Sequence, residues 1–102
     1  MRHIEKEMLT AIRCRHNWHK DNTTVEHQNG VTVIRLHGNH IATIDSSNHV
    51  SINTDTLHRW PTPTTKSRLR ALNVPVYTKN YETFIGNVPL NKYEDETFAL
   101  NY

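Results

Sequence analysis

The hydrophobic and polar positions of the chain follow two periodicities, one helical and one of strand type. Near the start, Ile4, Met8, Ala11 and Ile12 are spaced i, i+4, i+7, i+8, and charged residues fill most positions between them. This spacing predicts an amphipathic N-terminal helix of about three turns within residues 1–15. Such a helix either packs on the rest of the protein or offers a contact surface to a partner.

From Thr23 onward, apolar and polar residues alternate in short runs that are separated by turn residues. The runs are TTVEH, VTVIRLH, HIATID and HVSIN, and the segments between them are Gln28-Asn29-Gly30, Gly38-Asn39 and Ser46-Ser47-Asn48. Gly and Asn adopt the positive φ that tight hairpin turns require, so successive runs should pair antiparallel. The pattern predicts an antiparallel β-meander of about four strands.

The run VTVIRLH is predicted to be a central strand of this meander. Val33 points to one face of the strand, whereas Ile34 and Leu36 belong to the other. Apolar residues on both faces indicate a strand that is covered on both sides. We therefore expect both Val33 and Ile34 to be buried.

The segment RWPTPTT is predicted to connect the meander to a second helix. Pro61 and Pro63 lack a backbone N–H and push the residues before them toward extended geometry. A helix is expected to begin at Thr64 or Thr65, either of which can serve as its cap.

This short helix, near residues 64–73, is expected to have an apolar face and a positively charged side. Leu69 and Leu72 are spaced i, i+3 and should face the sheet. Lys66 and Arg70 lie one turn apart on the outer side of the helix, and both side chains, like that of Arg68, are expected to face solvent.

The remaining residues, 74–102, predict further short strands. The expected strands centre on Val76, Phe84-Ile85 and Phe98, with turns at Lys79-Asn80 and Gly86-Asn87. The fold class is therefore α+β, with an N-terminal amphipathic helix, an antiparallel meander, one short helix and a C-terminal β-hairpin. A chain of 102 residues fits a single domain, made of a helical extension (1–15), a core (16–73) and C-terminal strands (74–102).

Charge is segregated along the chain, although the net charge is only +2. Residues 1–20 hold five Lys/Arg and two acids, residues 21–58 one Arg and four acids, residues 59–79 five Lys/Arg and no acid, and residues 80–102 one Lys and four acids. The blocks either pair with one another in the fold or leave a basic face for phosphates.

The candidate site is the stretch PTPTTKSRLRAL, which joins hydroxyl groups and cations at an expected helix start. Unpaired N–H groups and the helix dipole attract anions there, and Thr, Lys and Arg add side-chain donors. We expect a nucleic-acid phosphate as the ligand. The candidate binding residues are Thr64, Thr65, Lys66, Ser67, Arg68 and Arg70, together with Arg59 and Lys20. The alternative is that one threonine only caps the helix and that the cations are solvated. The lack of a Gly-rich loop, which would complete a phosphate cradle, supports this alternative.

Histidine and cysteine give only a weak metal signal. Cys14, His16 and His19 could offer three ligands, but their spacing matches no standard zinc site. His37 and His40 flank a Gly-Asn turn, which indicates hairpin geometry, although two imidazoles there could also hold a metal. We expect no metal and no cofactor.

Neither a nucleophile motif nor a forced carboxylate pair is present, so an enzyme is less expected than a binding protein. His37 could still meet Asp45 or Asp55 in space. Trp18 and Trp60 each lie beside basic residues. They could stack on bases, but a tryptophan at the rim of a small core is more often a packing residue.

Cellular location follows from what the sequence lacks. A single cysteine excludes an internal disulfide and suits a reducing compartment. The first residues, MRHIEKEMLTAIRCRHNW, contain no apolar run of the length that a signal peptide or a membrane helix needs. The sequence predicts a cytosolic protein that does not enter a membrane.

The segments HNWHKDNTTVE, GVTVIRLHGNHIATID and TTKSRLRAL resemble a small domain that recurs in tailed-phage and prophage genomes. The similarity covers about residues 16–73 and is densest in RLHGN-x-IA and TTKSRL, while VYTKNYETFI is similar more loosely. The N-terminal helix is expected to be specific to this chain. The resemblance implies a phage accessory protein in the cytoplasm of the bacterial host and implies no particular activity.

Two functions fit such a protein. One is nucleic-acid binding through Lys66, Arg68, Arg70, Arg59 and Lys20. The other is binding to a host protein, as an inhibitor or modulator of an enzyme, a transcription factor or a defence system. The sequence favours the first, and it does not indicate an oligomeric state.

Overall fold

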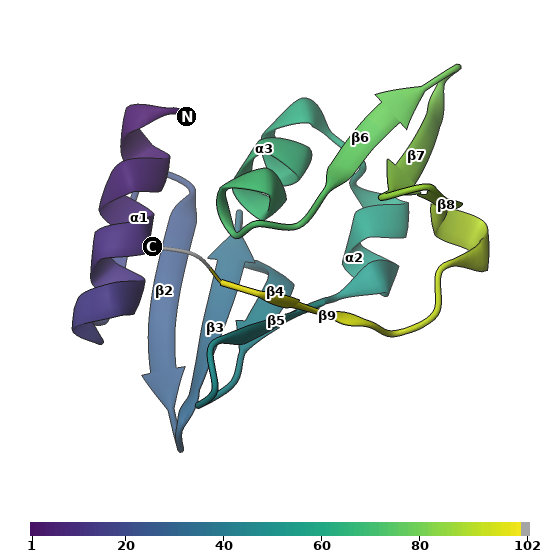
Figure 1. The fold of residues 1–102 in the computed structure, drawn as a ribbon. Coiled ribbons are helices and arrows are strands. Elements are labelled where there is room, and N and C mark those ends of the chain that lie inside the picture. The colour runs from purple at the N-terminus through teal and green to yellow at the C-terminus, as the bar shows by residue number, and fades with distance from the viewer. Residues whose placement is uncertain (101–102) are drawn as a thin grey trace.

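The computed structural model describes residues 1–100 and has an α+β fold with nine strands and three α-helices (Figure 1). The helices are α1 (His3–Cys14), α2 (Thr54–Arg59) and α3 (Pro63–Ala71), and a 3-10 turn covers Leu90–Lys92. The strands are β1 (Trp18–Lys20), β2 (Thr23–Gln28), β3 (Val31–Leu36), β4 (Asn39–Ile44), β5 (His49–Ile52), β6 (Val76–Lys79), β7 (Glu82–Ile85), β8 (Val88–Pro89) and β9 (Thr97–Ala99).

The main sheet has six strands in the order β1-β2-β3-β4-β5-β9, and every neighbouring pair is antiparallel. The predicted four-stranded meander corresponds to β2–β5 and is confirmed. Two strands that the meander did not include extend it at its edges. At one edge β1 pairs with β2, and at the other the C-terminal strand β9 returns to pair with β5.

Strand β3 is central and buried on both faces, as its sequence predicts. Ile34 is fully buried and Val33 is 8% exposed. The neighbouring strand β4 carries one extra residue. Ala42 faces Ile34 and His40 faces Arg35, so Ile41 between them has no partner on β3. This bulge at Ile41 allows two successive residues of β4, Ile41 and Ala42, to be buried.

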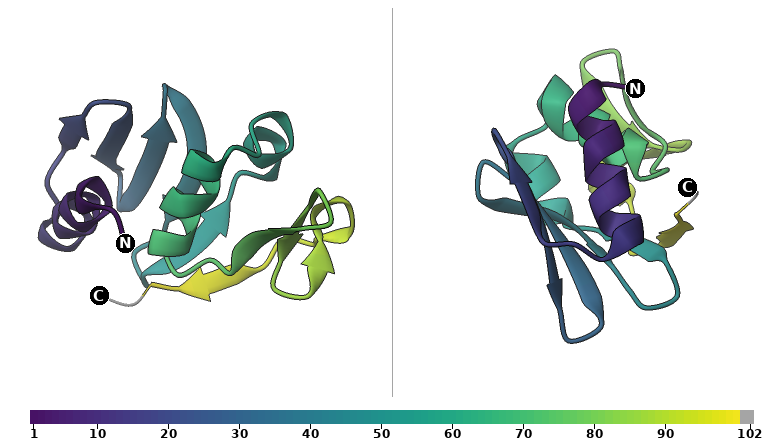
Figure 2. Two further views of the ribbon diagram at one scale, coloured as in Figure 1. Left: turned by 90° about the horizontal axis from the view of Figure 1, so that it is seen from above. Right: turned by 90° about the vertical axis from the view of Figure 1, so that its left-hand side faces the viewer.

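Helices α1 and α3 lie side by side on one face of the main sheet, as Figure 2 shows. The apolar residues predicted for the first helix include Met8, Ala11 and Ile12, and all three are buried in the core. Leu69 and Leu72 reach the same core from the other helix and are fully buried, as predicted. The N-terminal helix therefore packs on the sheet and forms part of the core.

The segment between the meander and α3 is more helical than the sequence analysis predicted. Helix α2 was not predicted, and the signal for it is Asn53, whose side chain accepts a hydrogen bond from the Thr56 N–H at 3.2 Å. Helix α3 begins at Pro63, not at Thr64 or Thr65, with Thr62 as its cap. Proline is tolerated at the first helical position because the N–H it lacks would have no partner there.

The predicted C-terminal hairpin is confirmed as β6 and β7, to which β8 adds a third strand. The turn at its tip contains Asn80 and Tyr81, whose φ angles are +51° and +64°. Positive φ at both central residues is the geometry of a tight hairpin turn. The tip projects from the side of the molecule beyond α3 (Figure 1).

A buried ion pair joins α1 to α3. The guanidinium Nη1 of Arg68 donates to Oε2 of Glu5 at 2.7 Å, and the two side chains are 3% and 2% exposed. Ser67 Oγ donates to the same carboxylate oxygen at 2.6 Å, and Arg2 N–H donates to the other oxygen at 3.1 Å. Arg68 Nε also donates to Thr23 Oγ1 of β2 at 3.0 Å. One carboxylate therefore ties together two helices, and its arginine partner reaches the sheet.

These contacts set the ionisation of Glu5. Burial by itself raises the pKa of the Glu5 carboxyl, but the hydrogen bonds from Ser67, Arg68 and the Arg2 N–H outweigh it, and the net pKa is lowered. The folded protein thus holds Glu5 as a carboxylate.

We predict that Arg68→Ala lowers the free energy of unfolding by about 3–5 kcal/mol, because it leaves the Glu5 carboxylate buried without its cation. Chemical denaturation measured by circular dichroism provides the value. Arg13→Ala, which removes an exposed arginine from α1, is the control and should change stability by less than about 0.5 kcal/mol. Equal stability of the two variants would contradict the role given to the pair.

We also predict that Glu5 contributes to the acid sensitivity of the fold. Its folded pKa lies below its unfolded value, so its stabilisation is present above the unfolded pKa, about 4.3, and is lost as the pH falls through the folded pKa. The free energy of unfolding should therefore fall more between about pH 5 and pH 3 in the wild type than in Glu5→Gln. Parallel pH profiles of the two proteins would rule this out.

Candidate anion-binding site

The residues of the stretch PTPTTKSRLRAL point in three directions in the structure. Thr64 and Thr65 lie in the first turn of α3, where Thr62 already occupies the cap position. The Thr65 N–H donates to Thr62 Oγ1 at 3.1 Å, and the two hydroxyl groups are 2.9 Å apart. Both threonines line a small pocket of about 200 Å³, together with Trp60. At the start of α3, the N–H groups of Thr65 and Lys66 are therefore already bonded to the side chain and the carbonyl of Thr62.

Ser67 and Arg68 point toward α1. Both donate to Glu5, and Arg68 is 3% exposed. The expectation that Arg68 faces solvent is wrong, because the carboxylate of Glu5, 63 residues away in sequence, holds it inside the protein. Its charge is neutralised there, so the geometry gives Arg68 a structural task.

Lys66 and Arg70 point toward the β6–β7 hairpin. They line a pocket of about 410 Å³ between α3 and the hairpin, whose other lining residues are Pro61, Pro63, Thr78, Tyr81 and Thr83. Lys66 is only 6% exposed, contrary to the expectation that it lies in solvent. Its ammonium group donates a hydrogen bond to the Thr78 hydroxyl.

The surroundings of Lys66 disfavour the charged form of its side chain. Burial lowers the pKa of the Lys66 ammonium, and the positive charge of Arg70 lowers it further. Both influences disfavour the charged form, and a hydroxyl group is the hydrogen-bond partner.

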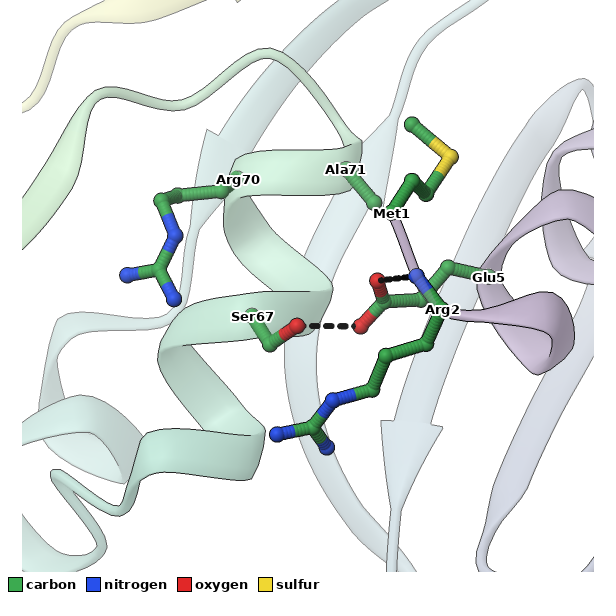
Figure 3. A pocket seen from close by; sticks show the side chains of 6 residues that line it. All are labelled: Met1, Arg2, Glu5, Ser67, Arg70 and Ala71. Carbon is green, nitrogen blue, oxygen red and sulfur yellow. Dashed lines mark hydrogen bonds between the residues drawn. The ribbon is translucent and has the colours of Figure 1, made fainter.

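Arg70 connects this pocket to a second one. The second pocket, of about 550 Å³, lies between the start of α1 and α3 and is lined by Met1, Arg2, Glu5, Ser67, Arg70 and Ala71 (Figure 3). Arg70 is exposed, and its Nη1 donates to the Val76 carbonyl of β6 at 3.1 Å. In Figure 3 its side chain points away from Glu5. We call Arg2, Lys66 and Arg70 the α3 cation cluster.

No carboxylate neutralises the α3 cation cluster within residues 1–100. The five ion pairs in this part of the chain are His3–Glu7, Lys20–Glu7, Arg35–Glu26, His49–Asp45 and Arg68–Glu5. Glu5 is the one acid that lines either pocket, and its carboxylate already accepts hydrogen bonds from Ser67, Arg68 and the Arg2 N–H. Three cations along two adjoining pockets, with hydroxyl groups from Ser67, Thr78 and Thr83, can bind an anion.

The other two predicted binding residues lie elsewhere. Lys20, on β1, donates to Glu7 of α1 at 2.7 Å and is thus paired. Arg59 is the exposed last residue of α2, beside Trp60, and lines neither of the two pockets. The structure brings Lys66 and Arg70 together and separates them from Lys20.

Sequence reasoning missed Arg2, Thr78 and Tyr81. Arg2 reaches α3 from the N-terminus, and its guanidinium lies 3.5 Å from Thr64 Oγ1, a contact across 62 residues that no local pattern indicates. Tyr81 gave a usable signal, because a large aromatic residue in a tight turn is uncommon.

The histidines and the cysteine do not assemble into a metal site. Among residues 1–100, no group of three or more His, Cys, Asp or Glu side chains is placed to hold a metal ion. Cys14 is exposed at the end of α1, and the ring of His19 bonds to the Asp21 carbonyl at 3.0 Å. The carboxylate of Asp45 accepts hydrogen bonds from the N–H groups of Ser47 and His49 in its own turn.

The two tryptophans differ in exposure. Trp18 packs against the core, whereas Trp60 is 51% exposed. None of the helices in the described residues is both long and apolar enough to span a membrane.

Comparison with known proteins places the chain in a phage family. The family model described as Kyanoviridae Gp96 protein matches residues 1–101. No curated protein and no solved structure matches. The match includes the N-terminal helix, so the expectation that this helix is specific to the chain is wrong, and the resemblance to small phage proteins is confirmed over a longer range than residues 16–73. The chain belongs to the Kyanoviridae Gp96 family of phage proteins.

Proposed function

We propose that this phage protein binds nucleic acid, and that the α3 cation cluster contacts the phosphates. The observation that carries the proposal is the Lys66 ammonium, which is buried beside Arg70 with a hydroxyl group as its partner and without a carboxylate. The sequence analysis expected phosphate to bind at the N-terminus of α3. In this proposal, phosphate instead binds to side chains on the side of α3.

The energetics of Lys66 favour an anionic ligand. A buried charge is costly unless it is paired and hydrogen-bonded. Lys66 has one hydrogen bond to Thr78, and the neighbouring charge that lowers its pKa, that of Arg70, is also positive. A phosphate in the pocket would supply both the missing negative charge and further acceptor oxygens.

The layout of the cluster favours a chain of phosphates over a single one. Arg70 lines both pockets, with Arg2 in one and Lys66 in the other. Cations in two adjoining pockets can contact successive phosphates of one backbone, which fixes the position of a strand without reading its sequence. The arginines add planar guanidinium groups, which bind phosphate through two parallel hydrogen bonds.

We predict that binding of labelled oligonucleotides weakens steeply as salt increases, because each neutralised phosphate releases counterions. Arg2→Ala, Lys66→Ala and Arg70→Ala should each reduce the slope of log K against log salt by about one unit. Fluorescence anisotropy at several salt concentrations measures the slope.

Two controls make this test specific. Arg13→Ala removes the same charge from the far end of α1 and should leave the slope unchanged. Lys20→Ala removes a cation that already has an acidic partner and should change it by much less than one unit. Absence of binding to any nucleic acid at low salt, by a folded preparation, would refute the proposal and favour the alternative that the protein binds a host protein.

A further prediction separates a binding role of Lys66 from a structural one. Lys66→Met keeps the apolar stem and removes the buried charge, so it should leave the free energy of unfolding unchanged or raise it by about 1 kcal/mol, while weakening nucleic-acid binding. Denaturant unfolding and anisotropy on the same preparation measure the two effects. Destabilisation by Lys66→Met without loss of binding would assign Lys66 to the fold alone.

A further inference from the structure

Exposed aromatic residues gather on the hairpin beside the α3 cation cluster. The large hydrophobic side chains that are exposed in residues 1–100 are Met1, Trp60, Tyr77, Tyr81 and Val88. Tyr77 and Tyr81 belong to the β6–β7 hairpin, which forms one wall of the pocket of Lys66 and Arg70. From this placement we infer that the nucleic acid is single-stranded and that its bases stack on Tyr81 and Tyr77, an inference that rests on the proposed function.

Tyr81 has no packing role in the folded chain. Its side chain is fully exposed, and it occupies a tight turn with φ of +64°, where a small residue such as Gly or Asn is favoured. It nevertheless lines the pocket that holds Lys66 and Arg70. A large flat ring at the mouth of a cationic pocket is placed to stack on the base of a nucleotide whose phosphate lies inside.

Tyr77 offers a second ring on the opposite face of the same hairpin. In β6 the side chains alternate, so Thr78 faces the pocket and Tyr77 faces away from it. Tyr77 stacks on Phe84 of β7, with ring centroids 5.5 Å apart and an interplanar angle of 12°. The phenylalanine supports one face of the tyrosine ring, which fixes its orientation before any ligand binds.

This arrangement fits a single strand better than a duplex. The cations lie on one face of the hairpin and the Tyr77–Phe84 pair on the other, with Tyr81 at the tip between them. A flexible strand can pass around the tip and place its bases on both rings. The bases of a duplex are already paired and stacked on one another, so neither ring can reach a base face without unstacking it.

The test compares a labelled single-stranded oligonucleotide of about 16 nucleotides with the duplex of the same sequence, at low salt, by fluorescence anisotropy. The wild type should bind the single strand more tightly. Tyr81→Asn should weaken single-strand binding about 5- to 150-fold, the range for loss of one stacked base, and change duplex binding less than about twofold. Asparagine is chosen because it tolerates positive φ, so the turn is kept.

Matched variants distinguish stacking from other effects. Tyr81→Phe keeps the ring and should bind like the wild type, and Tyr77→Phe should do the same. Val88→Ala removes exposed apolar surface from β8 of the same small sheet and should have no effect. Thermal unfolding by circular dichroism confirms that each variant is folded.

Each contrary outcome has a definite meaning. Equal affinity for single strand and duplex, or unchanged single-strand binding by Tyr81→Asn, would overturn the single-strand inference. If Lys66→Ala and Arg70→Ala still weaken binding in that case, the proposed function stands. Failure of the wild type to bind either oligonucleotide would overturn both.

Discussion

The burial of the Glu5–Arg68 ion pair is the constraint on which the arrangement of the helices depends. Neither group could remain in the interior without the other, since removal of one partner leaves an uncompensated buried charge. The pair holds α1 against α3, and the bond from Arg68 to Thr23 ties both helices to β2. The rotation of α3 about its axis is also fixed. Residues two positions from Arg68 lie about 200° around a helix, so Lys66 and Arg70 are turned to the opposite side, toward the hairpin.

The same pair determines where positive charge remains. Five of the chain's cations fall between residues 59 and 79, without an acid among them. Glu5 neutralises one of the five, Arg68, and both of its carboxylate oxygens then accept hydrogen bonds. Lys66 and Arg70 have no carboxylate partner within residues 1–100, and Arg2 joins them because the helix that carries Glu5 brings the N-terminus beside α3. The arginine of the structural ion pair and two of the three members of the α3 cation cluster thus come from one basic segment.

Sequence patterns predicted the parts of the fold that depend on local spacing. The meander, the burial of Val33 and Ile34, the C-terminal hairpin and the apolar face of α1 all follow from alternation, turn residues and helical period, and the structure confirms them. The start of α3 was displaced, because Pro63 was taken to exclude a helix although it is suited to the first helical position.

The candidate site was less predictable, because long-range contacts decide it. The sequence around Arg68 and Lys66 does not distinguish them from solvent-exposed residues of a helix. They are buried because Glu5 approaches Arg68 and Thr78 approaches Lys66 in the fold. Segregation of charge marks residues 59–79 as a basic segment. It could not show which of its cations would be neutralised.

The pairing of β9 with β5 has a consequence for how the chain folds during synthesis. His49 faces Ala99, and Asn73, just after α3, donates to the Ala99 carbonyl at 2.8 Å. The sheet edge and the end of α3 are therefore completed by a strand that follows α3 and the three-stranded sheet in the chain. Like the contact between residues 5 and 68, the pairing of β5 with β9 joins segments that are far apart in sequence, and contacts of this kind slow folding. A nascent chain in which β9 has not yet been synthesised presents an open strand β5, so the main sheet is expected to be complete only once residues 97–99 are available to pair.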